Sequence, residues 1–232
     1  MKKLQAKRIL YLVGLPLWVI LSFVMATLLC SLVVGNASLT TTESLLFQAV
    51  SYSVTLLILL GLPYVLKGYK VSLKTMGLER LMSWFDILLA IAGFIVYFLL
   101  AMTLLALAHS LFSSFDATQA QDLGVSSQLF GAERMQAFFL MVVIGPIVEE
   151  VIFRGYLYGE LRKQKMPAWL TTLVVSVLFG IAHGQWNVGI DVFALSVSMC
   201  VLRELTGSIW AGVLVHIIKN LIAFIGVFVL MS

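Results

Sequence analysis

Seven apolar stretches alternate with short polar segments along this chain. They cover residues 9–34, 44–66, 85–112, 134–160, 168–184, 187–204 and 207–230. A helix that crosses a lipid bilayer needs about 20 predominantly apolar residues, and each stretch is close to that length. No soluble domain, internal repeat or low-complexity tract separates them. The pattern therefore predicts an all-α, polytopic membrane protein with about seven transmembrane helices and the lipid bilayer as its surroundings.

The amino-acid composition supports this interpretation. Hydrophobic residues make up 61% of the chain, charged residues only 11%, and the mean hydropathy is +1.06. A soluble domain could not bury so much apolar surface. The first stretch, from Ile9 to Val34, is longer than the apolar part of a signal peptide, so we expect it to be retained as a span. Cys30 and Cys200 lie far apart in apolar stretches, which favours packing over a disulfide framework.

The basic residues indicate how the chain is oriented. Most of them cluster in residues 2–8, 67–80 and 162–165, whereas residues 35–43 and 109–133 contain no Lys or Arg. Because basic loops stay on the cytoplasmic side, this alternation predicts a cytoplasmic N-terminus. It also explains the net charge of +4 without a nucleic-acid partner. Residues 71–84 mix apolar and charged positions at helical spacing, which fits either an interfacial amphipathic helix or an ordinary basic loop.

Polar residues that are expensive in a bilayer gather in the last four stretches. The fourth stretch contains Glu149, Glu150 and Arg154, the fifth has His183 near its end, and the seventh contains His216, Lys219 and Asn220. Lys219 is about 100° from Asn220 around the helix, so it is expected to lie off the face that His216 and Asn220 share. A charge at mid-membrane costs several kcal/mol, about 3 by insertion scales, so each one needs a partner or a function. One buried histidine is often only a hydrogen bond between helices. So many polar groups in less than half of the chain predict a functional site.

Helical geometry separates the two adjacent glutamates. Glu150 lies four residues before Arg154 and shares a helix face with it, so this pair is predicted to be largely structural. Glu149 has no such local partner, shares a helix face with Gly145 and Phe153, and is the better candidate for a general base. Pro146 is expected to distort the helix nearby and free a carbonyl that could hold water. His183 lies as far after the predicted turn at Met166 as Glu149 lies before it, which predicts that the two are level.

Three short motifs in this region resemble a known family. They are EEVIFR at residues 149–154, F-x-x-x-H from Phe179 to His183, and H-x-x-x-N from His216 to Asn220. Together and in this order they resemble the CPBP family of intramembrane proteases, which includes type II CAAX prenyl endopeptidases and bacteriocin-processing or Abi proteins. The resemblance covers about residues 135–230. It divides the chain into residues 1–132, with three helices and a cytoplasmic amphipathic loop, and a catalytic core at residues 133–232.

The family resemblance implies an endopeptidase that cuts a membrane-embedded or lipid-associated peptide or protein. In that scheme Glu149 and His183 activate water, and His216 and Asn220 support the oxyanion; Glu150, Arg154 and Phe179 are supporting residues. The residues themselves agree with these roles, since a carboxylate and an imidazole can hold a water molecule and the other two can donate hydrogen bonds. We expect access from the cytoplasmic side of a bacterial cell membrane. The sequence does not indicate the oligomeric state.

The involvement of a metal stays open at this stage. Glu149, His183 and His216 would make a plausible three-ligand Zn²⁺ site with water as the fourth ligand. The family is usually called metalloprotease, although its glutamate-and-histidine scheme needs no ion. The zinc motif H-E-x-x-H is absent from this chain. We therefore expect at most one divalent ion, and favour slightly a site without a tightly bound one.

Two other kinds of function are compatible with polar groups inside a membrane. The alternative is a non-enzymatic bacteriocin-immunity or scaffold protein that binds a membrane partner. A transporter or proton relay could also place Glu, His and Asn at mid-membrane. Transporters usually show matching halves with broken helices in both, and only one Pro-interrupted helix carries the polar groups here. The sequence therefore favours the protease, with the scaffold second.

Overall fold

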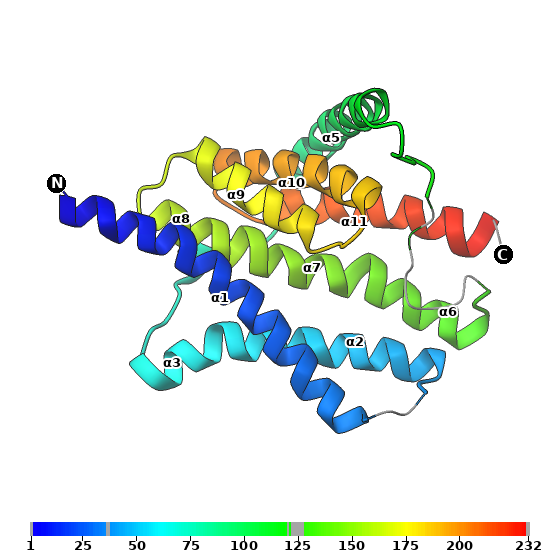
Figure 1. The fold of residues 1–232 in the computed structure, drawn as a ribbon, viewed down its shortest axis with the longest axis horizontal. Coiled ribbons are helices and arrows are strands. Elements are labelled where there is room, and N and C mark those ends of the chain that lie inside the picture. Colours follow the sequence, from blue (N-terminus) through cyan, green and yellow to red (C-terminus); the bar gives the residue numbers. More distant parts are fainter. Residues whose placement is uncertain (1, 36–37, 120, 122–127, 231–232) are drawn as a thin grey trace.

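The computed structural model describes residues 2–35, 38–119, 121 and 128–230, and the side chains from residue 8 onward. The N-terminal basic side chains Lys2, Lys3 and Lys7 thus lie outside the description. The described chain is helical and has no strand, which confirms the all-α prediction (Figure 1). Its helices are α1 (Lys2–Val34), α2 (Thr41–Leu56), α3 (Leu62–Lys67), α4 (Leu73–Met76), α5 (Trp84–Leu111), α6 (Gly131–Phe138), α7 (Gly145–Glu150), α8 (Tyr158–Lys163), α9 (Ala168–Ile181), α10 (Trp186–Thr206) and α11 (Trp210–Ile225). Four π-helical segments continue these helices: η1 (Leu57–Gly61), η2 (Phe139–Ile144), η3 (Val151–Leu157) and η4 (Gly226–Leu230).

Within the described ranges, five helical runs are long and apolar enough to cross a membrane. They are Arg8–Val34, Thr41–Lys67, Trp84–Leu111, Gly131–Lys163 and Trp210–Leu230. The chain is therefore an integral membrane protein. The other two predicted helices are present as α9 and α10, but they do not meet this criterion, so the structure does not settle the predicted count of seven spans. α9 is shorter than a span, and α10 contains polar residues such as Asn187, Asp191, Arg203 and Glu204.

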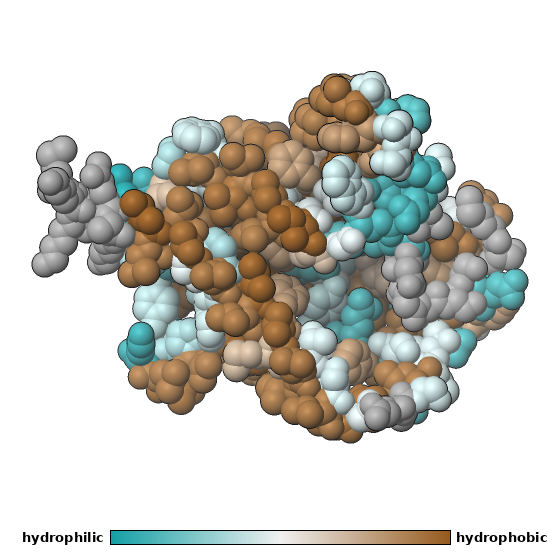
Figure 2. Space-filling model, in the orientation of Figure 1, coloured by the Kyte–Doolittle hydropathy of each residue, from teal (hydrophilic) through white to brown (hydrophobic). Residues whose placement is uncertain are grey.

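The polar helix α10 is shielded by its neighbours. It packs against α5, α9 and α11, and its side chains Asn187, Ser196, Ser198 and Arg203 are buried. The apolar core around it includes Leu195 and Met199. α1 and α2 lie together on the other side of the long helix that runs from α6 to α8 (Figure 1). The visible surface along the helices is mostly hydrophobic, as a lipid-facing surface should be (Figure 2).

Residues 71–84 form a packed loop with one short helix. α4 has only four residues and ends at Gly77, which has a left-handed φ of 68°. Met76 is buried, Arg203 donates to the carbonyl oxygen of Thr75 at 2.9 Å, and the N–H of Ile209 donates to that of Gly77 at 3.2 Å. These contacts hold the loop against the end of α10 and the turn that precedes α11. Of the two sequence interpretations, the structure supports a loop and not a long amphipathic helix.

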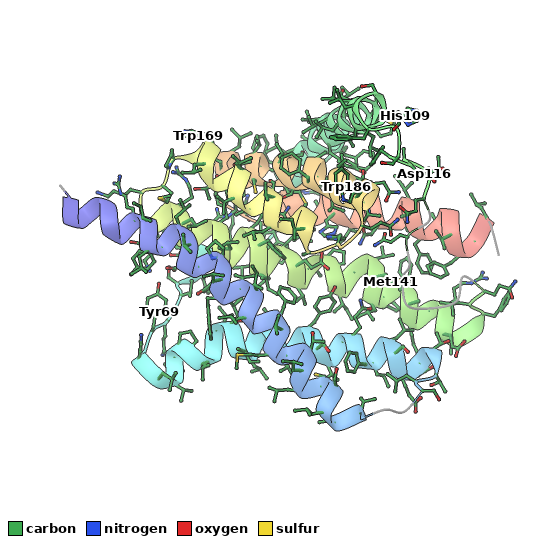
Figure 3. All side chains as sticks on the ribbon, in the orientation of Figure 1. Tyr69, His109, Asp116, Met141, Trp169 and Trp186 are labelled. Carbon is green, nitrogen blue, oxygen red and sulfur yellow. The ribbon has the colours of Figure 1, made fainter. Side chains whose placement is uncertain are left out.

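Side chains at the helix ends and in the connecting loops mark the two ends of the molecule. Tyr69 and Trp169 lie at one end, whereas His109, Asp116 and Trp186 gather toward the other (Figure 3). Tyr69 donates a hydrogen bond of 2.5 Å to Glu160 Oε2 in α8. The axes of α1, α2, α7 and α11 run between these two ends, whereas α5 is seen nearly end-on in this view (Figure 1).

The close approach of the 71–84 loop to α8 can be tested at Gly159. A Cβ atom at Gly159 would fall on the carbonyl oxygen of Thr75, whereas a Cβ at Gly14 in α1 would meet nothing within 4 Å. Overpacking a tight contact costs about 1–3 kcal/mol. We expect Gly159→Ala to lower the unfolding temperature in detergent and Gly14→Ala to leave it unchanged or slightly raised, as followed by thermal unfolding of the purified protein. Equal unfolding temperatures for the two variants would contradict the close contact between Gly159 and Thr75.

Candidate active site

One cavity collects the polar residues that the sequence singled out. Its volume is about 1190 Å³, and its walls come from α1, α2, the helix from α6 to η3, the end of α9, and α11 with η4. Most of the lining is apolar, with Phe23, Phe224 and Phe228 among the larger side chains. The hollow opens between α1, α2 and α9, where hydrophilic atoms are visible (Figure 2). The four predicted catalytic residues all line this cavity: Glu149, His183, His216 and Asn220.

Glu149 lies at the cavity wall with its two carboxylate oxygens in different surroundings. Its Oε1 accepts a hydrogen bond of 2.7 Å from the hydroxyl of Tyr52, and its Oε2 lies 3.8 Å from His216 Nε2. Its side chain is 18% exposed, whereas the neighbouring Glu150 is fully buried. Gly145 and Phe153 line the same cavity, which confirms the predicted helix face. Glu149 is thus the one carboxylate of the pair that a molecule in the cavity can reach.

Glu150 and Arg154 form the predicted ion pair. Arg154 Nη1 donates to Glu150 Oε1 at 2.8 Å, and neither side chain is exposed. Two further contacts surround the pair: the guanidinium lies 4.4 Å above the centre of the Phe179 ring, and His216 Nδ1 lies 3.3 Å from the same Oε1. Gly212 of α11 leaves room for the carboxylate, because a Cβ there would be 3.1 Å from Glu150 Oε2. The pair therefore joins three separate helices.

His183 has its ring orientation set by the helix that precedes it. Nδ1 lies 2.8 Å from the carbonyl oxygen of Phe179. Because a carbonyl can only accept, Nδ1 carries the proton, and in the neutral ring Nε2 keeps its lone pair. The Phe179 ring also packs edge-on against both His183 and His216, at centroid distances of 5.0 and 5.7 Å. The phenylalanine of the F-x-x-x-H motif thus fixes two imidazoles at once.

Asn220 is bound to an irregular part of the helix that carries the glutamates. The distortion expected near Pro146 takes the form of the π-helical segment η2, in which the N–H of Gly145 donates to the carbonyl of Leu140. The next donor in that register would be Pro146, which has no N–H, so the carbonyl of Met141 is left free. Asn220 Nδ2 donates to this carbonyl at 2.8 Å. Met141 lies on this helix where it passes below α11 (Figure 3).

The freed carbonyl therefore has a different role from the expected one. The sequence suggested that it could hold water beside Glu149; instead it holds the Asn220 side chain. An amide group has two N–H donors, so the second stays available toward the cavity. Lys219, expected away from the site, in fact lines the cavity, and its Nζ lies 3.6 Å from Asp191 Oδ2 in α10. Tyr97 donates to the other oxygen of Asp191 at 2.8 Å.

The proposed metal ligands do not gather around one point. In the part of the chain that the structure describes, no three His, Cys, Asp or Glu side chains lie close enough to hold one ion. His216 Nε2 is 3.8 Å from Glu149 Oε2, and its Nδ1 faces Glu150. Glu149, His183 and His216 are thus of the right chemical type for Zn²⁺, but their arrangement does not fit a three-ligand site.

Sequence reasoning missed two residues of this site. Tyr52 comes from α2, about a hundred residues away, and no spacing rule along one helix links it to Glu149. Gly212 matters because it lacks a side chain, and no sequence pattern marks such a position. Both contacts arise from tertiary packing between helices that are distant in the sequence.

Comparisons with known proteins support the resemblance that the motifs predicted. Residues 131–222 match the family described as type II CAAX prenyl endopeptidase Rce1-like. This confirms the CPBP resemblance for the segment that contains all three motifs. No solved structure matches the chain.

Two curated bacterial proteins are each similar to the chain over 90 or 99 residues. "Putative membrane peptidase YdiL" of Bacillus subtilis (strain 168) is 32% identical over 90 residues, which cover 37% of this chain and 36% of that protein. "Membrane-embedded CAAX protease MroQ" of Staphylococcus aureus (strain USA300) is 26% identical over 99 residues, which cover 40% and 39% respectively. The chain thus matches less than two-fifths of the length of each relative.

The buried Glu150–Arg154 pair is expected to determine the stability of the site. Removing one partner of a buried pair leaves an uncompensated charge and costs about 3–5 kcal/mol. We expect Arg154→Ala to lower the unfolding temperature in detergent strongly. Arg162→Ala is the matched control, because its pair with Glu204 is about one-third exposed on both sides and should contribute less than about 1 kcal/mol. Similar decreases in unfolding temperature for both variants would show that the buried pair stabilises the protein no more than the exposed pair does.

Proposed function

We propose that this chain is an intramembrane endopeptidase that hydrolyses a peptide bond in a membrane-embedded or lipid-associated peptide or protein. The observation that carries the proposal is the convergence of Glu149, His183, His216 and Asn220, from three helices, on one largely apolar cavity. The match of residues 131–222 to the Rce1-like family and the printed names of the two relatives support it. In this proposal residues 133–232 supply the catalytic groups, and residues 1–132 enclose them.

Water activation follows from the two groups whose free atoms face the cavity. One hydrogen of a bound water molecule is donated to Glu149 Oε2, since Oε1 is already held by Tyr52. The other hydrogen is donated to His183 Nε2, whose lone pair is free because Nδ1 bonds the Phe179 carbonyl. The lone pair of the water oxygen can then approach the carbonyl carbon of the scissile peptide bond. As the C–O bond forms, Glu149 takes the proton.

The next step is stabilisation of the tetrahedral intermediate. The second N–H of Asn220 can donate to the oxyanion while the first stays on Met141. His216 can donate through Nε2 when both its nitrogens are protonated, with Nδ1–H directed to Glu150. Glu149 then gives its proton to the leaving amine as the C–N bond breaks, which leaves one new carboxylic acid and one amine; the acid afterwards loses its proton to the amine or to water. Fixed donors in an apolar cavity act more strongly on a developing charge than they would in water.

The proposal also includes a direction of access. The basic tracts predict a cytoplasmic N-terminus in a bacterial cell membrane, with the substrate reaching the cavity from the cytoplasmic side. Both relatives are bacterial proteins. The largely apolar walls suit a membrane-associated segment, and the polar groups among them suit its peptide bond.

The proposed activity can be tested by comparing peptides in membranes of cells that carry the wild type or Glu149→Gln. Loss of a general base slows such a reaction by about 10²–10⁴-fold. We therefore expect one or more membrane-associated peptides to be produced by the wild type and absent with Glu149→Gln, as measured by mass spectrometry. Glu79→Gln, an exposed carboxylate in the 71–84 loop, is the matched control and should behave as the wild type.

The outcome of that comparison also decides between the protease and the alternative. Identical peptide patterns for the wild type and Glu149→Gln would contradict the endopeptidase. A protective or binding phenotype that survives Glu149→Gln would then favour a non-enzymatic immunity or scaffold protein.

Metal dependence can be measured on the purified wild type with the peptide found in this way. Since the described carboxylates and imidazoles do not form a three-ligand cluster, we expect excess EDTA or 1,10-phenanthroline to leave the cleavage rate within about two-fold of its starting value. Loss of activity on chelation, restored by adding Zn²⁺, would show instead that Glu149, His183 and His216 rearrange around an ion.

A further inference from the structure

Tyr52 contacts the proposed catalytic base from outside the family-matched segment. It belongs to α2, whereas the match to the Rce1-like family begins at residue 131. Its hydroxyl donates to Glu149 Oε1 at 2.7 Å, and its ring lies near Gly145, where a Cβ would be 3.6 Å from the Tyr52 oxygen. The contact therefore joins α2 to the helix that carries the glutamates at the position of the proposed chemistry.

Packing on both sides of Tyr52 holds α2 in this place. Leu45 is buried in a cluster with Ala137 and Leu140, and Ala49 packs against the same cluster. Beyond Tyr52, Trp18 of α1 donates to the carbonyl oxygen of Leu59 at 3.2 Å. The Tyr52 side chain is thus positioned by apolar contacts one and two turns away, independently of the hydrogen bond that it makes.

A carboxylate on a flexible side chain needs such a contact to be oriented. The terminal torsion of glutamate has a broad, two-fold preference, so its two oxygens exchange easily unless one is bound. His216 Nε2 lies at 3.8 Å, which is too far for a hydrogen bond. Tyr52 is therefore the only hydrogen-bond partner that the structure records for Glu149 within the described residues. It leaves Oε2 free on the cavity side.

We propose that Tyr52 is a positioning residue that fixes the Glu149 carboxylate through Oε1 and so assigns Oε2 as the atom that accepts the proton from water. This inference rests on the proposed endopeptidase function. It adds α2 to the active site: the N-terminal helices then orient the base as well as enclosing the cavity.

The test is Tyr52→Phe, which removes only the hydroxyl. The assay is cleavage of a quenched fluorescent peptide that spans the site identified by the membrane comparison. A hydrogen bond to a charged group corresponds to about a 10- to 100-fold change in rate, so we expect kcat to fall by that factor with KM within about two-fold of the wild type. Tyr158→Phe is the matched control: it removes a hydroxyl that donates to Glu204 at the same distance of 2.7 Å, away from the cavity, and should leave kcat unchanged.

A double-mutant cycle separates positioning from a general effect on folding. In a Glu149→Asp background the shortened carboxylate cannot reach the Tyr52 hydroxyl, so Tyr52→Phe should there change the rate by less than about three-fold. The unfolding temperatures of the single variants are measured in parallel. A structural defect would instead lower the rate by the same factor in both backgrounds and would lower the unfolding temperature as well.

The outcomes distinguish this inference from the proposed function. If the wild type cleaves the peptide, Glu149→Gln does not, and Tyr52→Phe equals the wild type, the role of Tyr52 is wrong and the endopeptidase stands. If Tyr52→Phe raises KM and leaves kcat unchanged, Tyr52 binds substrate and does not position the base. If Glu149→Gln cleaves normally, the endopeptidase itself is wrong.

Discussion

The fully buried ion pair between Glu150 and Arg154 is the constraint on which the rest of the site depends. A charge removed from water costs several kcal/mol unless it is matched by a partner in good geometry. The pair draws in groups from other helices: His216 of α11 lies against the carboxylate, and the Phe179 ring of α9 lies under the guanidinium. Among the described residues, Glu150 Oε2 and the Nε and Nη2 atoms of Arg154 have no hydrogen-bond partner. One buried charge pair therefore brings three helices together without satisfying all of its own polar atoms.

This constraint gives two adjacent glutamates different surroundings. Neighbours on a helix point about 100° apart, so with Glu150 held inward, Glu149 must face another side. That side is the cavity, where Glu149 keeps partial exposure and contacts Tyr52. His216 lies between the two carboxylates, with one ring nitrogen toward each. A fully buried carboxylate and one that faces the cavity can thus stand next to each other because the helix turns between them.

The sequence was most informative where a contact depends on spacing along one helix. It predicted the helices, the Glu150–Arg154 pair and the shared face of Glu149, Gly145 and Phe153, because these follow from the rise and twist of a helix. It predicted a distortion near Pro146 but not the π-helical form that η2 takes there, nor the π-helical segments η1, η3 and η4. It also placed Lys219 away from the cavity, because a rule for ideal helices ignores how α11 is rotated against its neighbours.

The contacts of α1 and α2 give these N-terminal helices a second role in the proposed enzyme, beyond enclosing the cavity. In the proposed endopeptidase, a membrane-associated substrate has to pass α1 and α2 to reach the cavity, because both helices line it. Any displacement of α2 beside Tyr52 lengthens the 2.7 Å bond to Glu149, because the neighbouring Glu150 is held by the buried pair. Under the proposal, access to the cavity and orientation of the Glu149 carboxylate are therefore coupled through α2.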